Sequence, residues 1–252
     1  MAETGVNDDS VLYAVAGHVA TITMNRPDVA NAQNTALIDG IDHFLDVADA
    51  DDEVRVVILA GSGKHFSAGH DLGDIATGER LPRPNYQSHI IERLAYLPIP
   101  VISAVHGHCY TGALELALVG DIILAAESAK FADTHARWAL TPVWGLSQRL
   151  PRRVGTYKAR EMMFTCRTYS GRQAEAMGLA NSCVPDAEFD AALGALTVEI
   201  LANSAYSHAA NKRLLTRTDG LPIDAGLAHE IYHGEGRGPD MEARIGAFTR
   251  KG

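Results

Sequence analysis

One carboxylate, Glu115, lies in an apolar helical stretch directly after the small residues Thr111 and Gly112, within HGHCYTGALELALVGDI (residues 106–122). If Thr111 or Gly112 begins the helix, Glu115 falls in its first turn. A carboxylate there favours the positive end of the helix dipole and can cap backbone N–H groups, which is a structural role. In a partly dry pocket it would instead have a raised pKa and act as a general base. The segment alone leaves both roles open.

Two loops rich in small residues are the second candidate for chemistry. KHFSAGHDL (residues 64–72) follows the apolar segment VRVVILAG (54–61), and HGHCYTGAL (106–114) follows PVISAV (100–105). Exposed backbone N–H groups in such turns, next to a helix start, suit a negatively charged oxygen. Two converging turns would form an oxyanion hole, in which each donor contributes roughly 2.7–4 kcal/mol to the transition state. Tight turning and close packing by glycine and alanine is the structural alternative.

The elements that would position these loops alternate along the chain. Alternating apolar and polar residues predict a β-hairpin over residues 11–27, and helical spacing of apolar residues predicts a helix over 34–50. A second helix is predicted over 85–97, and further strands are predicted at 54–61, 100–107, 121–128 and 181–185. From residue 189 the pattern is almost entirely helical, with a break at 236–239. We therefore expect an α/β core over residues 1–188 and a helical C-terminal region over 189–252.

The acidic composition excludes several classes of function. The net charge is −9, from 22 Lys and Arg residues against 31 Asp and Glu residues, so the sequence has no basic nucleic-acid footprint. No apolar run is long enough to span a membrane, and MAETGVNDDS at the N-terminus lacks the pattern of a signal peptide. Three scattered cysteines fit neither a disulfide framework nor a zinc site, so we expect a cytoplasmic protein without a metal.

Three blocks of sequence carry a resemblance to a known family. They are KHFSAGHDL, AVHGHCYTGALELALVGDI and FADTHARWALTPVWGLSQRLPRRVG, and TITMNRPDVANA and MEARIGAFTRK extend the match over about residues 10–251. Together and in this order they resemble the crotonase superfamily, the enoyl-CoA hydratase/isomerase family. The resemblance implies an α/β, crotonase-like spiral of ββα turns with a helical C-terminal trimerisation region. It also implies an acyl-CoA thioester substrate, no cofactor beyond the CoA of that substrate, and a homotrimer or dimer of trimers.

The same resemblance assigns expected roles to individual residues. The backbone N–H groups of His70 and Gly112 would form the oxyanion hole, and Glu115 would be a catalytic glutamate that activates water. Other matched positions are expected to contact CoA: Ala68, Asp71 and Leu72 along its arm, Ala30 near the adenine, and Phe248 and Lys251 from the C-terminal pattern, often in a neighbouring subunit. Asp28 stands near Ala30 where the family often has a basic residue, which puts that adenine contact in doubt.

The third block departs from the hydratase pattern at one position. Hydratases of the family carry a second glutamate, and an ungapped match of FADTH places His135 there. Histidine can accept or donate a proton near neutral pH, so His135 is a candidate catalytic partner of Glu115. The alternative is a structural histidine that hydrogen-bonds to Asp133 or to a backbone carbonyl. Asp133 is itself a candidate substitute for the missing carboxylate, but in an extended segment residues 133 and 135 share a face, so either could point away from the pocket.

Three functions therefore stay open at the level of sequence. The first is hydration of a trans-2-enoyl-CoA to a 3-hydroxyacyl-CoA, which the match at Glu115 favours. The second is double-bond isomerisation, or another crotonase reaction that needs one glutamate. The third is an acyl-CoA-binding protein without chemistry, against which the retention of Glu115 argues, because binding alone needs no base there.

Overall fold

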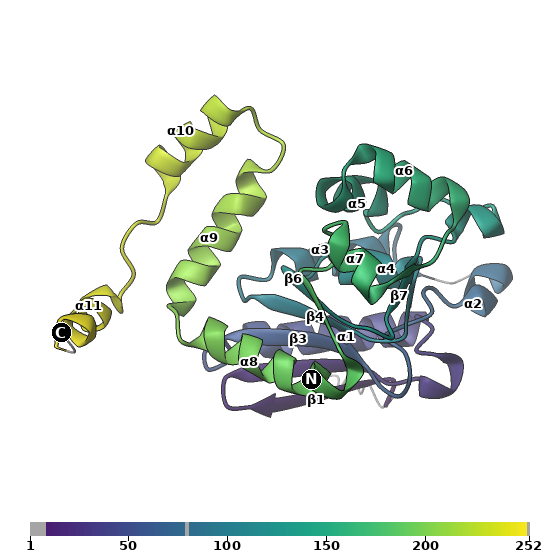
Figure 1. Cartoon of the computed structure of the whole chain (residues 1–252), viewed down its shortest axis with the longest axis horizontal. Helices are drawn as coiled ribbons and strands as arrows, with labels where there is room; N and C mark the ends of the chain where they lie inside the picture. Colours follow the sequence, from purple (N-terminus) through teal and green to yellow (C-terminus); the bar gives the residue numbers. More distant parts are fainter. Residues whose placement is uncertain (1–8, 79–80, 251–252) are drawn as a thin grey trace.

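Two β-sheets form the body of the molecule in the computed structural model, which describes residues 9–78 and 81–250 (Figure 1). Within these residues the larger sheet has six strands in the order β1-β2-β3-β4-β6-β9. They are β1 (Val11–Ala16), β2 (Val19–Met24), β3 (Val56–Gly61), β4 (Val101–Val105), β6 (Ile122–Ala126) and β9 (Ser182–Val184). β1 pairs with β2 in antiparallel fashion, as the predicted hairpin requires, and the other neighbours are parallel.

The smaller sheet gives the chain its spiral course. It consists of β5 (His108–Tyr110), β7 (Lys130–Ala132) and β8 (Tyr169–Ser170), in that order. After β4 and after β6 the chain leaves the larger sheet and adds a short strand, β5 or β7, to the smaller one. The loop after β3 does the same through a bridge between Ser67 and Cys109. Successive turns of the chain therefore stack their loops at one edge of the molecule.

Helices cover both faces of the larger sheet. α1 (Thr35–Asp49) and α3 (Tyr86–Tyr96) pack with Val57 and Leu59 of β3 in the main apolar core. α8 (Phe189–Leu201) packs against Val56 and Ile58, which point to the opposite face because side chains alternate along a strand. Both faces of β3 are therefore buried, which explains why its sequence is continuously apolar. The remaining helices of the body are α2 (Leu72–Thr77), α4 (Gly112–Ala117), α5 (Leu146–Val154), α6 (Thr156–Thr165) and α7 (Gly171–Ala176).

The last three helices form an arm that extends away from the body (Figure 1). They are α9 (Ala205–Thr218), α10 (Ile223–His233) and α11 (Met241–Thr249), and the predicted break at residues 236–239 separates α10 from α11. Lys212 anchors α9 by donating to Asp121 (2.7 Å) and to the carbonyl of Ile99 (3.1 Å). The expected helical C-terminal region is thus present, while the division at residue 188 stays a prediction because α8 packs on the sheet. In the described part of the chain, no helix combines the length and apolarity needed to cross a membrane.

Candidate active site

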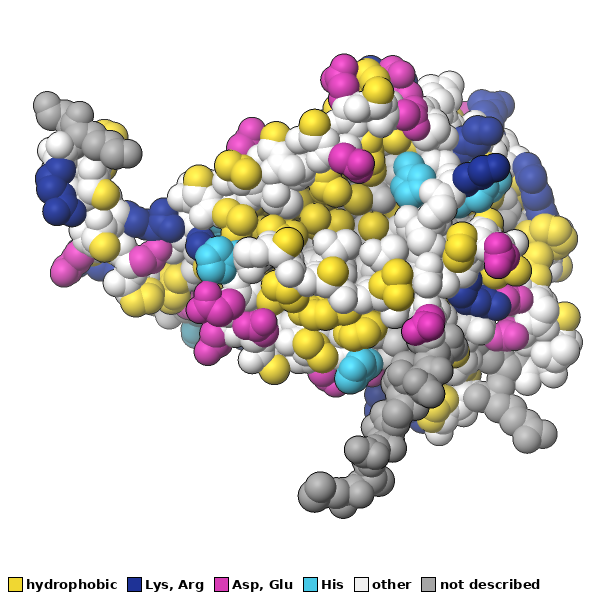
Figure 2. Space-filling model, turned by 90° about the horizontal axis from the view of Figure 1, so that it is seen from below, with side chains coloured by type: hydrophobic (Ala, Val, Ile, Leu, Met, Phe, Trp, Pro, Cys, Tyr) yellow, Lys and Arg dark blue, Asp and Glu magenta, His cyan; other side chains and the backbone are white. Residues whose placement is uncertain are grey.

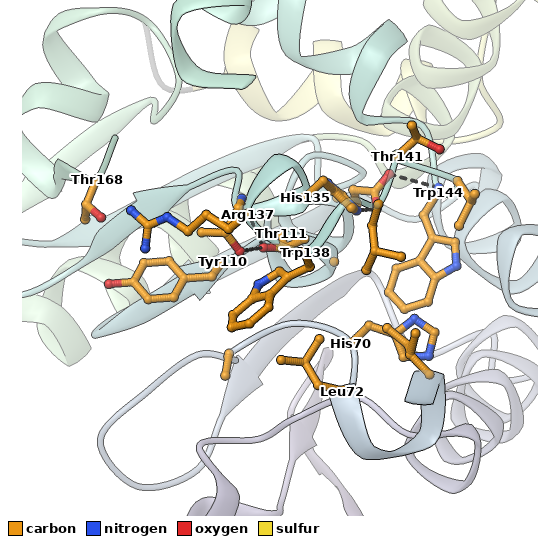
Figure 3. Close-up of a pocket in the computed structure, with 17 residues that line it drawn as sticks. His70, Leu72, Tyr110, Thr111, His135, Arg137, Trp138, Thr141, Trp144 and Thr168 are labelled. Carbon is orange, nitrogen blue, oxygen red and sulfur yellow. Dashed lines mark hydrogen bonds and ion pairs between the residues drawn. The ribbon is translucent and has the colours of Figure 1, made fainter. Parts of the chain in front are cut away.

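A cavity of about 410 Å³ lies at the edge where the loops of successive turns meet (Figure 3). Its walls come from the segment after β3, the start of α4, the short 3₁₀ helix η2 (His135–Trp138) and the loop before α5. His70, Gly112, Glu115 and His135, which come from three separate blocks of sequence, all line it. The volume is within the range of pockets that bind small molecules.

The two expected oxyanion donors belong to neighbouring backbone segments. Gly112 is the first residue of α4, where backbone N–H groups have no partner within the helix. A Cβ atom added to Gly112 would lie 3.1 Å from the backbone nitrogen of His70. The strand-like bridge between Gln33 and His70 fixes the second segment, because Gln33 donates to the carbonyl of Gly69 and accepts from the N–H of Asp71. The absence of a side chain at position 112 therefore keeps open the space beside both nitrogens.

Glu115 is almost completely buried, with 2% of its surface exposed. Its Oε1 atom accepts hydrogen bonds from the backbone N–H groups of Trp144 (2.9 Å) and Leu146 (3.1 Å). Its Oε2 atom lies 3.7 Å from Nε2 of His135. Burial raises the pKa of Glu115, and the two N–H donors and the charge of His135 only partly oppose this rise. One oxygen is thus fixed by backbone and the other faces the histidine, an arrangement suited to a general base.

His135 connects Glu115 to a second buried carboxylate. Its Nδ1 atom lies 2.6 Å from Oδ1 of Asp133, which also accepts the backbone N–H of His135 (3.1 Å). The segment is not extended at this point, since η2 begins at His135. The turn brings both the backbone N–H and the imidazole Nδ1 of His135 to the carboxylate of Asp133. The two roles weighed for His135 are therefore compatible, because its bond to Asp133 aims Nε2 at Glu115.

The other expected contact residues lie in different surroundings. Ala68 and Leu72 line the cavity, whereas Asp71 caps α2 and pairs with Arg26 (3.0 Å). Ala30 is not among the lining residues, and its carbonyl accepts the N–H of Ala68 (2.8 Å).

The two expected C-terminal contacts have a different position. Phe248 is 82% exposed on the arm, where it is not part of this cavity. Lys251 lies outside the described residues.

Three features of the site were not predicted from the sequence. The ring of Trp144 stacks on the ring of His70, with centroids 5.0 Å apart. The buried Oε1 of Gln33 lies 3.1 Å from the position of a Gly112 Cβ and has no hydrogen-bond partner among the described residues. Arg137 also lines the cavity, two residues after His135. It belongs to no recognisable motif, so nothing in the sequence singled it out.

A cavity with two adjacent backbone N–H groups and a buried carboxylate has the chemical groups needed to stabilise an oxyanion and to move a proton. The family model described as enoyl-CoA hydratase/isomerase matches residues 15–231. The chain therefore belongs to the enoyl-CoA hydratase/isomerase family, which is the crotonase superfamily expected from the sequence blocks, and its α/β fold is the crotonase fold.

Individual relatives agree with this assignment. The chain is 34% identical to a probable enoyl-CoA hydratase of Rhizobium meliloti, with 96% of each chain covered. It is 30% identical to the short-chain-enoyl-CoA hydratase of Clostridium acetobutylicum, over 88% of this chain and 87% of that protein. Among solved structures it resembles the enoyl-CoA hydratase of Bacillus anthracis, with a TM-score of 0.89, 30% identity and 96% of each chain covered.

Gly112→Ala tests the close approach at the candidate oxyanion hole. The new Cβ would lie 2.8 Å from the Trp144 ring and 3.1 Å from the His70 nitrogen. Such overpacking typically costs about 1–3 kcal/mol, so thermal unfolding should shift to lower temperature. Gly194→Ala is the matched control, because its Cβ would meet nothing within 4 Å on α8, and it should be neutral or stabilising. Equal melting temperatures for the two variants would contradict the close packing.

Glu115→Gln tests how the raised pKa of the buried carboxylate affects the stability of the fold. Because the folded-state pKa of Glu115 is raised, the folded protein binds the proton more tightly than the unfolded chain does. The ionised form therefore destabilises the fold at high pH, and this penalty disappears as the pH falls to the unfolded pKa near 4.5. We expect the glutamine variant to melt above wild type at about pH 8, with a difference that shrinks toward acid. A pH-independent difference would refute this.

Proposed function

We propose that this protein hydrates a trans-2-enoyl-CoA to a 3-hydroxyacyl-CoA. The observation that carries the proposal is the position of Glu115, a buried carboxylate with a raised pKa beside two backbone donors and 3.7 Å from His135. The names of the relatives support the same reaction, since those of Rhizobium meliloti and Clostridium acetobutylicum are described as enoyl-CoA hydratases.

The backbone N–H groups of His70 and Gly112 polarise the thioester in this proposal. Both residues line the cavity, and the space between them is free of any side chain of residue 112. When water adds to C3, negative charge moves onto the thioester oxygen as an enolate forms. Two preorganised donors stabilise that oxygen, and loss of one typically costs about 2.7–4 kcal/mol in the transition state.

Glu115 and His135 move the protons. The Glu115 carboxylate takes a proton from water as the water oxygen bonds to C3, and it becomes a carboxylic acid. His135, protonated at Nε2, gives its proton to C2 as the enolate collapses. One water molecule between Oε2 and Nε2, which lie 3.7 Å apart, then relays the proton from Glu115 to His135, which restores both groups and balances the addition of one water molecule to the substrate. Asp133 holds the imidazole through Nδ1 and is a positioning residue.

The CoA portion would run along the segment of Ala68, Asp71 and Leu72, with Ala30 toward the adenine. Phe248 lies on the arm and outside this cavity, so its contact would be made with the site of a neighbouring subunit. Lys251 has the same proposed role from the family resemblance alone. CoA is part of the substrate, and the proposed reaction needs no separate cofactor.

Exposed apolar side chains on the arm support a homotrimer or a dimer of trimers. Within the described residues the arm exposes eight large apolar side chains: Leu215, Leu221, Ile223, Leu227, Ile231, Tyr232, Ile245 and Phe248. Figure 2 shows apolar side chains on the projecting arm that ends at the grey C-terminal residues. Patches of this kind mark protein–protein contacts. All three cysteines are free and buried, which is consistent with the proposed cytoplasmic location.

Steady-state hydration of a short and a long trans-2-enoyl-CoA tests the chemistry. Glu115→Gln should lower kcat by about 10²–10⁴, the usual contribution of a general base, with little change in thioester binding. His135→Ala should also lower kcat, and Asp133→Asn should do so by a smaller factor while leaving KM unchanged. The exposed Glu199→Gln on α8 is the control and should match wild type.

Two outcomes would redirect the proposal. Conversion of a 3-enoyl-CoA to its 2-enoyl isomer without hydration would assign the isomerase reaction instead. Tight thioester binding without turnover, unchanged by Glu115→Gln, would leave a non-catalytic binding protein. For wild type, kcat/KM should fall on acidification through the raised pKa of Glu115, because the base must be ionised to accept a proton.

The assembly is tested by light scattering with Phe248→Ala. Wild type should have three or six times the chain mass of 27.0 kDa. If Phe248 reaches a neighbour's site, Phe248→Ala should raise KM for the CoA thioester without changing kcat. A monomeric wild type with full activity would exclude both the assembly and this contact.

A further inference from the structure

One side of the candidate active-site cavity carries a positive charge that the hydration chemistry does not use. Arg137 lines the cavity from η2, and Figure 3 shows its guanidinium extending between the side chains of Tyr110 and Thr168. The rings of His70 and Trp144 lie on the other side of the view, with Trp138 between the two groups. The cavity therefore has a catalytic side and a separate basic side.

The guanidinium of Arg137 has unused hydrogen-bonding capacity. Its Nη2 atom donates to the carbonyl of Cys166 (2.9 Å). No carboxylate pairs with it among residues 9–78 and 81–250, whereas nearby Arg167 pairs with Glu161. Because a guanidinium has five N–H donors in a planar fork, Arg137 can still bind a carboxylate through two parallel hydrogen bonds.

Polar groups surround this charge. Tyr110 and Thr168 line the cavity together with Arg137. Burial raises the pKa of Tyr110, while Thr168 and the charge of Arg137 oppose the rise, as expected for neighbouring groups. Two hydroxyl groups therefore stand beside the guanidinium.

The wall between the two sides of the cavity is mainly apolar. Leu72, Ile75, Trp138 and Leu140 all line it. Tyr110 ends β5 and precedes the proposed oxyanion donor Gly112 by two residues, so the basic side of the cavity lies close along the chain to the thioester site. A thioester held at Gly112 can thus run a short or medium acyl chain along an apolar wall toward the basic side.

From this arrangement we infer that the acyl group ends in a carboxylate, which Arg137 binds together with Tyr110 and Thr168. The substrate class is then an ω-carboxy trans-2-enoyl-CoA, and this inference rests on the proposed hydratase function. A hydrocarbon tail would take water from the guanidinium without replacing its hydrogen bonds, which is unfavourable. A carboxylate at the end of the acyl chain supplies the missing partner. The site therefore favours acyl chains that end in a carboxylate over those that end in hydrocarbon.

Matched substrates test the terminal group directly. The rate constant kcat/KM is measured for trans-2-enoyl-CoAs ending in a carboxylate and for the neutral carboxamides of equal length, over a series of chain lengths. Wild type should prefer the carboxylate at one length. Arg137→Met should lower that preference by about tenfold or more, because it removes a charge-assisted hydrogen bond. Arg137→Lys should retain part of it, and Arg160→Met, an exposed arginine on α6, should retain all of it.

Binding of saturated acyl-CoAs tests the inference without any chemistry. Calorimetry should give tighter binding for the saturated ω-carboxyacyl-CoA than for its carboxamide, and Arg137→Met should abolish the difference. This result would support the subsite even if neither enoyl substrate is hydrated, in which case the proposed hydratase function alone fails.

Two results would overturn the inference. One is equal binding of carboxylate and carboxamide by wild type at every chain length. The other is an equal loss of affinity for both acyl-CoAs and for free CoA in Arg137→Met, which would show that Arg137 binds the CoA phosphates instead. In both cases hydration of neutral substrates would leave the hydratase function standing.

Discussion

The burial of one carboxylate is the constraint on which the rest of the site depends. Removing Glu115 from water is costly, and the structure offsets this cost with two backbone N–H donors at residues 144 and 146. Those donors exist only because the loop before α5 returns to the start of α4. The remaining oxygen is left to face His135. The same burial that strains the fold is what keeps the carboxylate basic enough to take a proton.

The spiral course of the chain makes this arrangement possible. Each turn adds a strand to the larger sheet and then carries a loop to the same edge, so that residues near 70, 112 and 135 meet at one cavity. Helices pack on both faces of the sheet and bury its central strands. The sheet and its helices can therefore position the site residues on the loops without contacting the substrate themselves.

The class of fold and much of the site could be predicted from the sequence, for physical reasons. Buried parallel strands such as β3 are continuously apolar, and α1 has apolar residues at helical spacing, so local periodicity located both. His70, Gly112 and Glu115 lie in short blocks whose order along the chain is itself the signal. All three are candidate site residues on the basis of sequence alone, and the structure brings them to one cavity.

The remaining features depend on contacts between distant segments and local turns that no pattern encodes. Whether His135 faced Asp133 or the cavity could not be decided, because the outcome depends on the turn of η2. The approach of Gln33 to Gly112 arises from an isolated bridge between distant segments. That Arg137 pairs with no carboxylate among residues 9–78 and 81–250 is visible only in three dimensions, because its neighbours come from distant parts of the chain.

Trp144 connects the parts of this site more closely than its place in the sequence suggests. Its backbone N–H holds Glu115, and its ring stacks on His70 and would meet any side chain at Gly112. A change in the position of this one residue would therefore disturb the surroundings of Glu115, His70 and Gly112 together. Trp144 thus acts as a single joint between the two parts of the candidate site, and neither part can be repacked there without affecting the other.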